Sequence, residues 1–393
     1  MTTGNHASKI LFLDQSGKPG GAELCLLDIA AAFSDRCEVA LLEDGPFAEM
    51  LAEAGVTTHV IPLSGRVGAF RKAGGIIAAL RGLPGFMQAV AKVASRARAF
   101  DILYANTTKA AIIAAPASRI AGVPLVVHLH DIISDNHFGK LGRTALVRAA
   151  NHASLIIANS ASTREAFIEA GGNASQVITV PNGFHAERFA PIDDARKREI
   201  RAELGVNEHF TVGVFGRISE WKGQHVLLEA LHELPEIHVV VVGDALFTEA
   251  DKKYAERLRA LAGNPALLGR VHFTGFRDDT PALIQAMDVV VHTSVAPEPF
   301  GRVVVEAMLS GKPIVATAPG GPGEIVDHGG TGLLVPPADP ELLARAIHLL
   351  MTDRDLARKM GELAKQAATE RYSIEKVIQT IADCLVITSN RLQ

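Results

Sequence analysis

The chain has 393 residues and a formal net charge of −4, and 21% of its residues are charged. This length is typical of two domains rather than one, and the charge excludes a nucleic-acid binder that acts through overall charge. Three cysteines without a CxxC pair argue against a disulfide framework and favour a reducing compartment. No run approaches the roughly 18 apolar residues of a spanning helix, so we expect a cytoplasmic protein.

The first half of the sequence alternates short apolar runs with helical stretches. Lys9–Asp14 is typical of a buried parallel strand, and an apolar helix is expected over Leu24–Phe33. Between them, Gly20 and Gly21 would let a ligand approach the backbone, although an ordinary turn explains these glycines equally well. Further strands are expected at Val39–Leu42, Thr58–Pro62, Asp101–Ala105, Leu125–Leu129, Leu155–Asn159 and Gln176–Val180, and further helices at Phe47–Ala54, Ile76–Ala99, Thr108–Ala121, Leu141–Ala153 and Ala161–Ala170.

A second series follows the polar, charged segment Asp193–Glu203. Its expected strands are Phe210–Gly216, His238–Gly243, Val271–Gly275, Asp288–Thr293, Pro313–Thr317 and Gly332–Val335, and its expected helices are Gly223–Leu234, Glu249–Ala262, Thr280–Ala286, Val303–Ser310, Glu341–Met351, Arg354–Thr369 and Ser373–Ser389. The two series predict an α/β chain of two doubly wound, Rossmann-like halves with parallel sheets covered on both faces. Ligands of such sheets sit at the carboxyl ends of the strands, so two halves facing each other would form a cleft there.

Two cations follow the first strand of the second series. Gly216 and Arg217 end that strand, and Lys222 comes five residues later, before an expected helix. A forked guanidinium and a compact ammonium at one loop suit a diphosphate and would stabilise a departing one. The alternative is a pair of exposed basic residues in a loop.

Two glutamates flank the start of another expected helix. Glu298 and Glu306 would lie about 12 Å apart on a continuous helix, which exceeds the spacing of paired catalytic carboxyls in glycoside hydrolases. We therefore expect them to grip two ends of one long ligand, such as a nucleotide sugar, by accepting hydrogen bonds from hydroxyls. The alternative for Glu306 is an ordinary glutamate on a helix surface.

His128 and His130 share one side of their expected strand, and Asp131 follows at its carboxyl end. A His-Asp pair at a strand end can bond a hydroxyl or shuttle a proton, so His130 is a functional candidate. His128 is interpreted as structural. The sequence shows no spacing typical of a metal site, and Asp353 and Asp355 are interpreted as a solvated surface.

The window Ala54–Phe100 lacks Asp and Glu. Its apolar residues are interleaved with Arg66, Arg71, Lys72, Arg81, Lys92, Arg96 and Arg98. Such a region can lie on an anionic membrane surface, which would make the protein peripheral on the inner face of the membrane through residues 64–100. A solvated basic face beside a substrate site is the equally weighted alternative.

Several of these motifs together resemble the retaining glycosyltransferases of family 4, which have the GT-B fold. The most specific part is Glu298-Pro-Phe-Gly-x4-Glu306, which is similar to the E-x7-E motif of that family. The resemblance spans nearly the whole chain, and its supporting motifs are Gly20–Glu23, His130-Asp131, Pro181–Gly183, Phe215–Arg217 with Lys222-Gly223, Pro319–Glu324 and Gly330–Pro337.

The resemblance implies a different binding role for each of the two domains. Residues 1–183 with 374–393 would form an acceptor-binding domain, and residues 184–373 a nucleotide-sugar-binding domain. Arg217 and Lys222 would hold the diphosphate with help from the backbone of Gly20 and Gly21, and Glu306 would hold the ribose. The other implied contacts are Phe276 and Arg277 at the base, Glu298, Phe300 and Gly301 at the donor sugar, and His130 near the transferred sugar.

These implications predict transfer of a hexose, glucose as the first choice, from a UDP-sugar to a polysaccharide or lipid-linked acceptor. The resemblance implies no metal and no cofactor beyond the donor, and we expect no nucleic-acid partner. Two alternatives remain, namely a sugar-nucleotide epimerase or hydrolase of the same fold, and a non-catalytic nucleotide-binding subunit.

Overall fold

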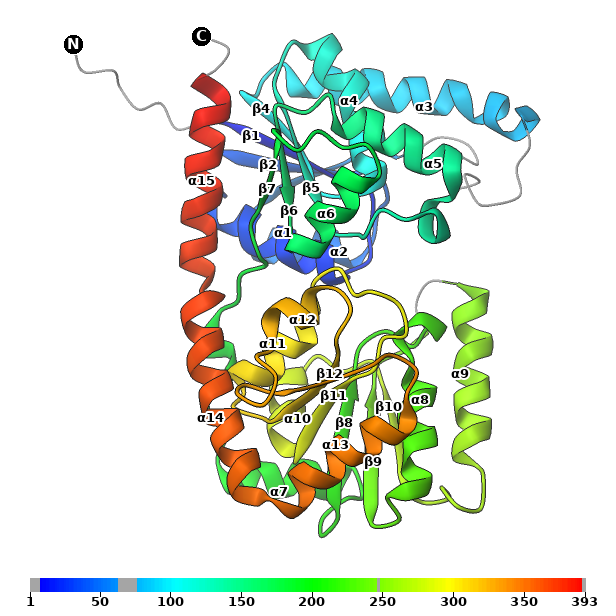
Figure 1. Ribbon diagram of the computed structural model, residues 1–393. Helices are drawn as coiled ribbons and strands as arrows, with labels where there is room; N and C mark the ends of the chain where they lie inside the picture. Colours follow the sequence, from blue (N-terminus) through cyan, green and yellow to red (C-terminus); the bar gives the residue numbers. More distant parts are fainter. Residues whose placement is uncertain (1–7, 63–75, 246–247, 391–393) are drawn as a thin grey trace, which may run out of the picture. The chain divides into compact units, whose positions relative to one another are not determined.

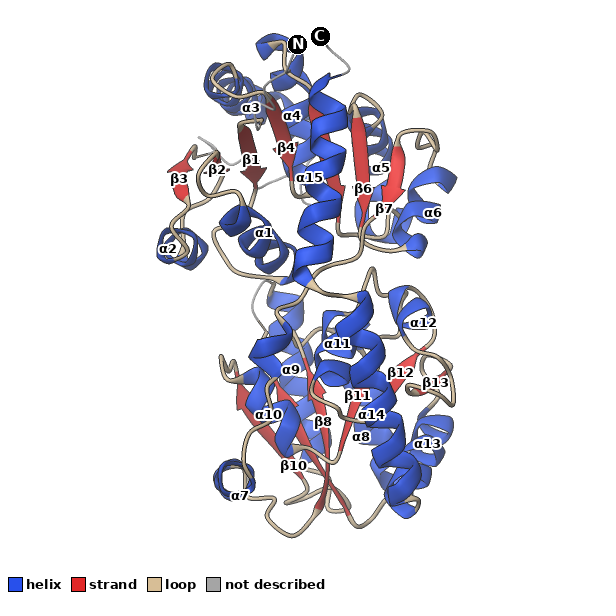
Figure 2. Ribbon diagram, turned by 90° about the vertical axis from the view of Figure 1, so that its left-hand side faces the viewer, coloured by secondary structure: helices blue, strands red, loops and turns tan. Residues whose placement is uncertain are grey.

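The computed structural model describes residues 8–62, 76–245 and 248–390. The chain divides into two compact units, of which the first comprises Met1–Gly183 with Ile374–Gln393 and the second Phe184–Ser373. Each unit is a parallel sheet with helices on both faces (Figures 1 and 2). The α/β class with two Rossmann-like halves is therefore confirmed.

The first unit contains a seven-stranded sheet in the order β3-β2-β1-β4-β5-β6-β7, with every described pair parallel. Its strands are β1 Ile10–Asp14, β2 Cys37–Leu41, β3 Thr57–Val60, β4 Ile102–Ala105, β5 Leu125–Leu129, β6 Leu155–Ala158 and β7 Val177–Thr179. Its helices are α1 Gly21–Ala32, α2 Pro46–Glu53, α3 Ile76–Ala97, α4 Thr108–Ala121, α5 Asp135–Ala150, α6 Ala161–Glu169 and α15 Ile374–Asn390.

Burial on both faces explains why these strands are continuous apolar runs. In β1, Leu11 and Leu13 join a core that α3, α4, α5 and α6 cover, whereas Ile10 and Phe12 join the opposite core beneath α1, α2 and α15. Successive side chains of a strand point to opposite faces, so each alternate residue of β1 belongs to a different core. One short run of four apolar residues thus holds two helical layers on one sheet.

The second unit contains a six-stranded sheet in the order β10-β9-β8-β11-β12-β13, again with every described pair parallel. Its strands are β8 Phe210–Phe215, β9 Ile237–Val242, β10 Val271–Gly275, β11 Val289–His292, β12 Ile314–Thr317 and β13 Leu333–Val335. Its α-helices are α7 Asp194–Glu203, α8 Gln224–Ala230, α9 Glu249–Ala262, α10 Thr280–Ala286, α11 Arg302–Leu309, α12 Gly321–Ile325, α13 Pro340–Thr352 and α14 Arg354–Arg371, and its short 3-10 helices are η2 Ala186–Phe189, η3 Glu220–Lys222 and η4 Leu231–Glu233.

Both sheets reverse their winding direction at one pair of strands. In the first unit β1 lies between β2 and β4, and in the second unit β8 lies between β9 and β11. The loops that leave such a pair diverge to opposite faces and leave a crevice at the carboxyl ends of the strands. The loops after β1, β4, β8 and β11 are therefore where the fold places ligands.

Three local expectations were incomplete. The polar segment before the second series is not a lead-in but helix α7, which begins after Asp193, whose side chain accepts a hydrogen bond from the Arg196 backbone N–H at 2.7 Å. Helix α5 begins at Asp135 rather than Leu141 and is interrupted at Gly139, where φ is 65°. The five-residue helix α12 was not expected, because its Gly-Pro-Gly sequence is typical of a turn.

Candidate active site

The centre of the candidate site in the second unit is Glu298, which lies in the loop that leaves β11. Its carboxylate oxygen Oε2 accepts hydrogen bonds from Lys222 Nζ at 2.5 Å, Ser294 Oγ at 2.9 Å and His292 Nε2 at 3.2 Å. Thr317 Oγ1 lies 3.2 Å from the other ring nitrogen of His292 and orients the imidazole. Residues from β11, from the loop that leaves it and from the loop after β8 thus converge on one carboxylate oxygen, and β12 orients one of them.

Glu298 is an ionised carboxylate despite its burial. Burial by itself would raise the pKa of Glu298, but the Lys222 charge and the hydrogen bond from His292 outweigh it and hold this pKa well below its usual range. Only 8% of the residue is exposed. Among the described residues, the hydrogen bonds to the Glu298 carboxylate go to Oε2, so Oε1 is the oxygen available to accept a hydrogen bond from a ligand hydroxyl.

The backbone of the Glu298 loop is fixed by close contact with the loop after β12. Glu298 and Gly320 form a parallel bridge, and the Gly321 N–H donates to the Glu298 carbonyl at 2.8 Å. A Cβ on Gly320, where φ is 90°, would lie 2.1 Å from that carbonyl oxygen. The glycine-rich sequence 319–324 is therefore required by the close approach of two backbones.

Lys222 and Arg217 both approach one tryptophan in the loop between β8 and α8. Lys222 Nζ lies 4.2 Å and the Arg217 guanidinium carbon 5.8 Å from the centroid of the Trp221 ring. The Lys222 carbonyl accepts a hydrogen bond from Thr293 Oγ1 at 2.9 Å, which ties this loop to the end of β11. Gly216, at the end of β8, donates its N–H to the Val242 carbonyl at 2.9 Å. The structure thus brings Lys222 and Glu298 into contact and places Arg217 beside the same ring as Lys222.

Glu306 lies on α11, whereas Glu298 precedes that helix. The helix begins at Arg302, after Gly301 with φ of 94°, so the 12 Å separation expected for a continuous helix does not apply. Burial raises the pKa of Glu306, and the Arg302 guanidinium, with Nε 3.6 Å from Oε1, partly offsets that rise. Glu306 is therefore a half-buried carboxyl with an adjacent cation rather than a solvated surface glutamate.

Phe300 has a structural position that the sequence did not reveal. Its side chain is buried between Phe184, with ring centroids 6.3 Å apart, and Tyr372, with centroids 5.8 Å apart. The aromatic side chain therefore anchors the start of α11 and does not offer its ring to a ligand.

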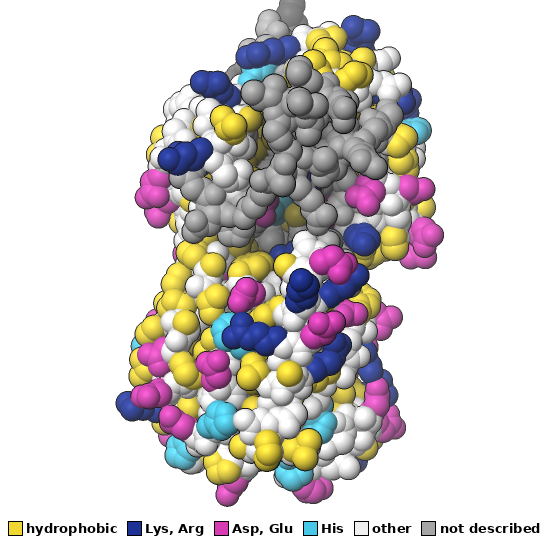
Figure 3. All heavy atoms as spheres, turned by 90° about the vertical axis from the view of Figure 1, so that its right-hand side faces the viewer, with side chains coloured by type: hydrophobic (Ala, Val, Ile, Leu, Met, Phe, Trp, Pro, Cys, Tyr) yellow, Lys and Arg dark blue, Asp and Glu magenta, His cyan; other side chains and the backbone are white. Residues whose placement is uncertain are grey.

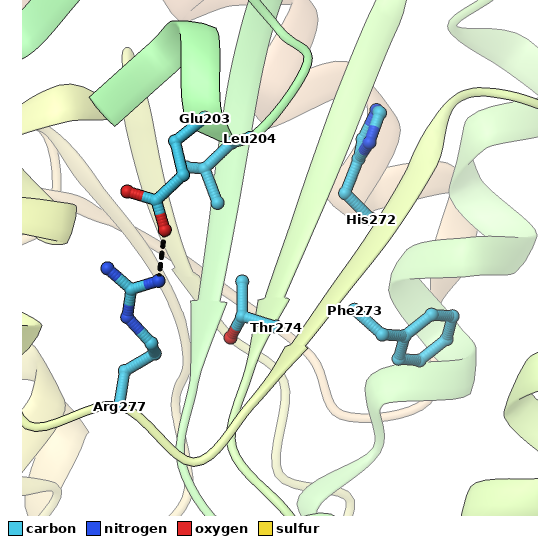
Figure 4. A pocket seen from close by; sticks show the side chains of 6 residues that line it. All are labelled: Glu203, Leu204, His272, Phe273, Thr274 and Arg277. Atoms are coloured by element: carbon cyan, nitrogen blue, oxygen red, sulfur yellow. Dashed lines mark hydrogen bonds and ion pairs between the residues drawn. The ribbon is translucent and has the colours of Figure 1, made fainter. Parts of the chain in front are cut away.

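The loop after β10 contains the residues expected beside a base. The Phe276 side chain is exposed at 64%, as a stacking surface requires. The guanidinium of Arg277 pairs with Glu203 (Figure 4) and also with Asp279. Arg277, Glu203, Leu204, His272, Phe273 and Thr274 line a hollow of about 390 Å³. The Arg277 guanidinium is thus paired with carboxylates of the protein, and Phe276 is the better candidate for contact with a base.

In the first unit, Gly21 begins α1, and its neighbour Gly20 is the N-cap. Glu23, in the first turn, is buried, and burial followed by the nearby Asp14 charge raises its pKa to about 8. Burial also raises the pKa of Asp14 to about 6 against the hydrogen bond from Asn106. Two carboxyls that are costly to ionise therefore lie beside the glycine loop.

His130 is connected to the Asp14 carboxyl through the buried Asn106. The imidazole Nε2 lies 3.1 Å from Asn106 Oδ1, and Asn106 Nδ2 donates to Asp14 Oδ2 at 2.7 Å and to the Ala22 carbonyl at 3.1 Å. Because Asn106 uses its amide hydrogens on these two oxygens, its Oδ1 must accept, so His130 Nε2 carries a hydrogen. The strand ends of β1, β4 and β5 meet in one polar chain.

His128 precedes His130 by two residues and is buried on the same side of the strand. Its Nδ1 lies 2.8 Å from the Tyr104 hydroxyl, and burial followed by the nearby His130 holds its pKa well below the usual value. The ring centroids of His128 and His130 are 3.9 Å apart. His128 is therefore a neutral imidazole in the core, next to the candidate functional histidine.

Three residues of these clusters were not predicted from the sequence. His292 and Ser294 hold Glu298, and Asn106 holds His130. In each case the available signal was a polar residue at the end of an apolar strand, where parallel strands present ligand-facing groups. The rule that identified Asp131 would also have identified these three residues.

The basic window is only partly within the described residues. Arg66, Arg71, Lys72 and the side chain of Arg81 lie outside them. Arg96 pairs with Glu38 and so is not available to a membrane, whereas Lys92 and Arg98 are exposed. On the face of the second unit drawn in Figure 3, Lys and Arg are interspersed with Asp and Glu. Within the described ranges, no helix is long and apolar enough to cross a bilayer.

Comparisons with known proteins cover both units. Residues 20–183 match the family described as "Glycosyl transferase 4-like domain", and residues 196–367 match "Glycosyl transferases group 1". The crystal structure of HepE from Anabaena in complex with UDP-glucose is 42% identical, with a TM-score of 0.88 over 96% of this chain and 99% of that one. A glycosyltransferase from Rickettsia africae shares the fold at 18% identity, with a TM-score of 0.79 over 99% of both chains.

A curated relative from Mycobacterium tuberculosis is a GDP-mannose-dependent alpha-(1-6)-phosphatidylinositol monomannoside mannosyltransferase. It is 31% identical over 282 residues, which cover 69% of this chain and 72% of the relative. The two parallel-sheet units and these matches define a GT-B glycosyltransferase. The chain belongs to glycosyltransferase family 4 and is a sugar-nucleotide-dependent glycosyltransferase.

Proposed function

We propose that this protein transfers glucose from UDP-glucose to a polysaccharide or lipid-linked acceptor, with retention at the anomeric carbon and without a metal. The observation that carries the choice of donor is the similarity to HepE, solved with UDP-glucose, at 42% identity over 96% of this chain. The GDP-mannose-dependent relative is more distant, at 31% identity over 69% of the chain. GDP-mannose is accordingly the competing donor.

Lys222 and Glu298 support the proposed donor site. Lys222 has three ammonium hydrogens and gives one to Glu298, so two remain for phosphate oxygens. Arg217 adds a planar donor beside the same tryptophan ring. We assign the diphosphate to these two cations, and we assign a donor-sugar hydroxyl to Glu298 Oε1, because an ionised carboxylate accepts such a bond.

The other donor contacts follow the line of α11. Glu306 would accept hydrogen bonds from the ribose hydroxyls, and the backbone N–H groups of Phe300 and Gly301 would face the sugar at the start of this helix, where N–H groups lack intrahelical partners. Phe276 would stack on the uracil. Gly216 would let the phosphates approach the backbone. In the first unit, Gly20 and Gly21 would likewise let a ligand approach the backbone closely.

The proposed chemistry is a front-face displacement. The bond between the anomeric carbon and the UDP oxygen breaks, the acceptor hydroxyl oxygen bonds to the same face of that carbon, and the acceptor proton passes to the departing phosphate oxygen. Lys222 and Arg217 stabilise the charge that develops on the diphosphate, which is the role a metal has in other transferases. His130 would lie near the transferred sugar, with its ring held by the contact of Nε2–H with Asn106.

Product analysis with radiolabelled UDP-glucose and GDP-mannose, each with and without an acceptor lipid extract, tests this proposal. We expect label in an acceptor-dependent product from UDP-glucose, and at least a 100-fold loss of kcat in Glu298→Gln. Glu249→Gln, which changes an exposed glutamate of the same unit, serves as the matched control. Free glucose or an epimerised donor would replace the proposal by a hydrolase or epimerase, and UDP binding without turnover of any sugar would indicate a non-catalytic subunit.

The lipid-linked acceptor fits a peripheral contact of residues 64–100 with an anionic membrane. Leu83 and Met87 are exposed at 50% and 52% on α3. The exposed Lys92 lies further along this helix, and the exposed Arg98 follows directly after its end. Vesicles containing phosphatidylglycerol should retain the protein at low salt and release it at high salt. Neutral vesicles are the control, and equal retention by both kinds, or by neither, would contradict this contact.

A further inference from the structure

We propose that Cys25, His128 and His130 form a binding site for a borderline-soft divalent cation, zinc above all, and that its occupation inhibits the enzyme. The three residues come from α1, from β5 and from the position after β5, all within the first unit. Each offers one ligand atom, and these atoms lie within 4.8 Å of one another.

The chemistry of the three donors selects the ion. One thiolate and two imidazoles are the ligands of Cys-His zinc sites, whereas magnesium and calcium require oxygen. Tetrahedral zinc holds neighbouring nitrogen and sulfur ligands about 3.3–3.6 Å apart, given bond lengths of about 2.0–2.3 Å. Side-chain movements on the order of 1 Å would therefore bring the three ligand atoms from their observed separations to those of a zinc site.

Hydrogen bonds outside the cluster already set the two imidazoles for this role. His130 Nε2–H donates to Asn106 Oδ1, so the lone pair of His130 is on Nδ1. His128 Nδ1 contacts the Tyr104 hydroxyl, which leaves Nε2 as its metal-facing atom. Metal-bound histidines characteristically use their second nitrogen in this way, which fixes the ring and its tautomer.

His128 Nε2 gives an independent indication. It is buried, and none of the described residues forms a hydrogen bond with it. A buried polar nitrogen without a partner is costly, and a metal ion would remove that cost. His128 is also almost wholly buried at 1% exposure, so bulk water does not take the place of a partner.

The surroundings suit a cation. With a thiolate and two neutral imidazoles, a dication leaves one net positive charge at the site. Asn106 connects the His130 ring to the buried Asp14 carboxyl, and Glu23 lies close enough to Asp14 for their charges to interact. Binding releases the Cys25 thiol proton to solvent, so the affinity should rise with pH.

Occupation would remove His130 from the proposed reaction. The ion would take the buried Nδ1 lone pair and would add positive charge to the ring that we place near the transferred sugar. This consequence rests on the proposed function, whereas metal binding itself does not. The two are measured separately below, so that failure of one does not imply failure of the other.

Cobalt(II) provides the binding test on the full-length protein, reduced with a phosphine and freed of metal. We expect one equivalent of Co²⁺ to give tetrahedral d–d bands and a thiolate-to-cobalt charge-transfer band, and one equivalent of Zn²⁺ to bleach both. Cys25→Ser should abolish the charge-transfer band, and His128→Gln should weaken Co²⁺ binding by at least 10-fold. Cys37→Ser, which removes another buried thiol of the same unit, should leave both unchanged.

Transfer assays provide the second readout. Zn²⁺ should inhibit the wild type and Cys37→Ser equally, and the half-inhibitory concentration should rise at least 10-fold in Cys25→Ser. His238→Asn controls for the stacked histidines His209, His238 and His272 in the second unit, and it should not change the inhibition. If Cys25→Ser fails to fold, Cys25→Ala replaces it. The absence of a charge-transfer band in the wild type, or its persistence without Cys25, would overturn the proposal.

Discussion

Lys222→Met removes the only lysine or arginine that the described structure places in contact with the Glu298 carboxylate. Two hydrogen-bond donors then remain on Oε2, His292 at 3.2 Å and Ser294 at 2.9 Å. Removing one partner of a buried ion pair costs about 3–5 kcal/mol, because the other charge stays buried without compensation. We expect the lower end, about 3 kcal/mol at pH 7, because 21% of the Lys222 side chain is exposed.

The cost should depend on pH with a defined sign. In the wild type the pKa of Glu298 is lowered, so this group contributes stability above its unfolded pKa of about 4.3 and loses it only as pH falls through the folded value. In Lys222→Met, burial dominates and raises the pKa of Glu298, so stability is lost as pH rises above about 4.3. The difference between the two proteins should therefore be largest near pH 7 and shrink towards pH 4.

Trp221, the only tryptophan of the chain, reports unfolding of the second unit by fluorescence. Urea titrations from pH 4 to pH 7 would give the free energy of unfolding for each variant. Lys252→Met is the matched control, because its pair with Glu249 is exposed and screened by solvent, so its removal should change the stability little. A Lys222→Met cost equal to that of the control, or one that grows towards pH 4, would refute the reasoning.

Three further outcomes are expected. Gly320→Ala should destabilise the second unit by at least about 2 kcal/mol more than Gly329→Ala, measured by the tryptophan signal. Both glycines have a positive φ, but only at Gly320 would the added Cβ collide with backbone atoms. Equal costs of the two substitutions would contradict the close approach. Above pH 8, the amides of α1 should exchange more slowly in Glu23→Gln than in the wild type. The reason is that a carboxyl with a raised pKa loses its stabilising contribution as pH rises from about 4.5 to about 8. Identical exchange of both proteins from pH 5 to pH 9 would exclude this titration. Phe276→Ala should raise the Kd for UDP about 5- to 100-fold, measured by calorimetry, and should leave the stability unchanged. Leu268 is similarly exposed, and Leu268→Ala should change neither the Kd nor the stability. An unchanged Kd in Phe276→Ala would remove Phe276 from the base site.

The sheets could be predicted because each strand is buried on both faces. A parallel strand between two helical layers buries the side chains of both its faces, so it is apolar throughout. The first three residues of Val289–His292 show this pattern. The helices were harder where they are polar: α7 contains one buried residue, Ile200, and so lacks a strong apolar stripe. Its capping Asp193 was the stronger signal.

The partners within the site could not be predicted. Lys222 and Glu298 are 76 positions apart, and their contact depends on β8 lying beside β11, which is a property of the strand order. The sequence identified both residues as candidates but assigned them to different parts of a ligand. The structure adds that each also determines the charge environment of the other. Likewise, nothing in the spacing of Cys25 indicates that it faces His128 and His130.

The order in which the chain is synthesised has a consequence for its folding. The second unit interrupts the first, and the core of the first unit includes Val377, Ile381 and Leu385 of α15. On a ribosome that adds about 5–20 residues per second, the entire second unit is made during an interval on the order of 10–40 s before that helix exists. During this interval α1 and β1 lack the apolar face of α15, so the first unit would be the one that nascent-chain chaperones recognise.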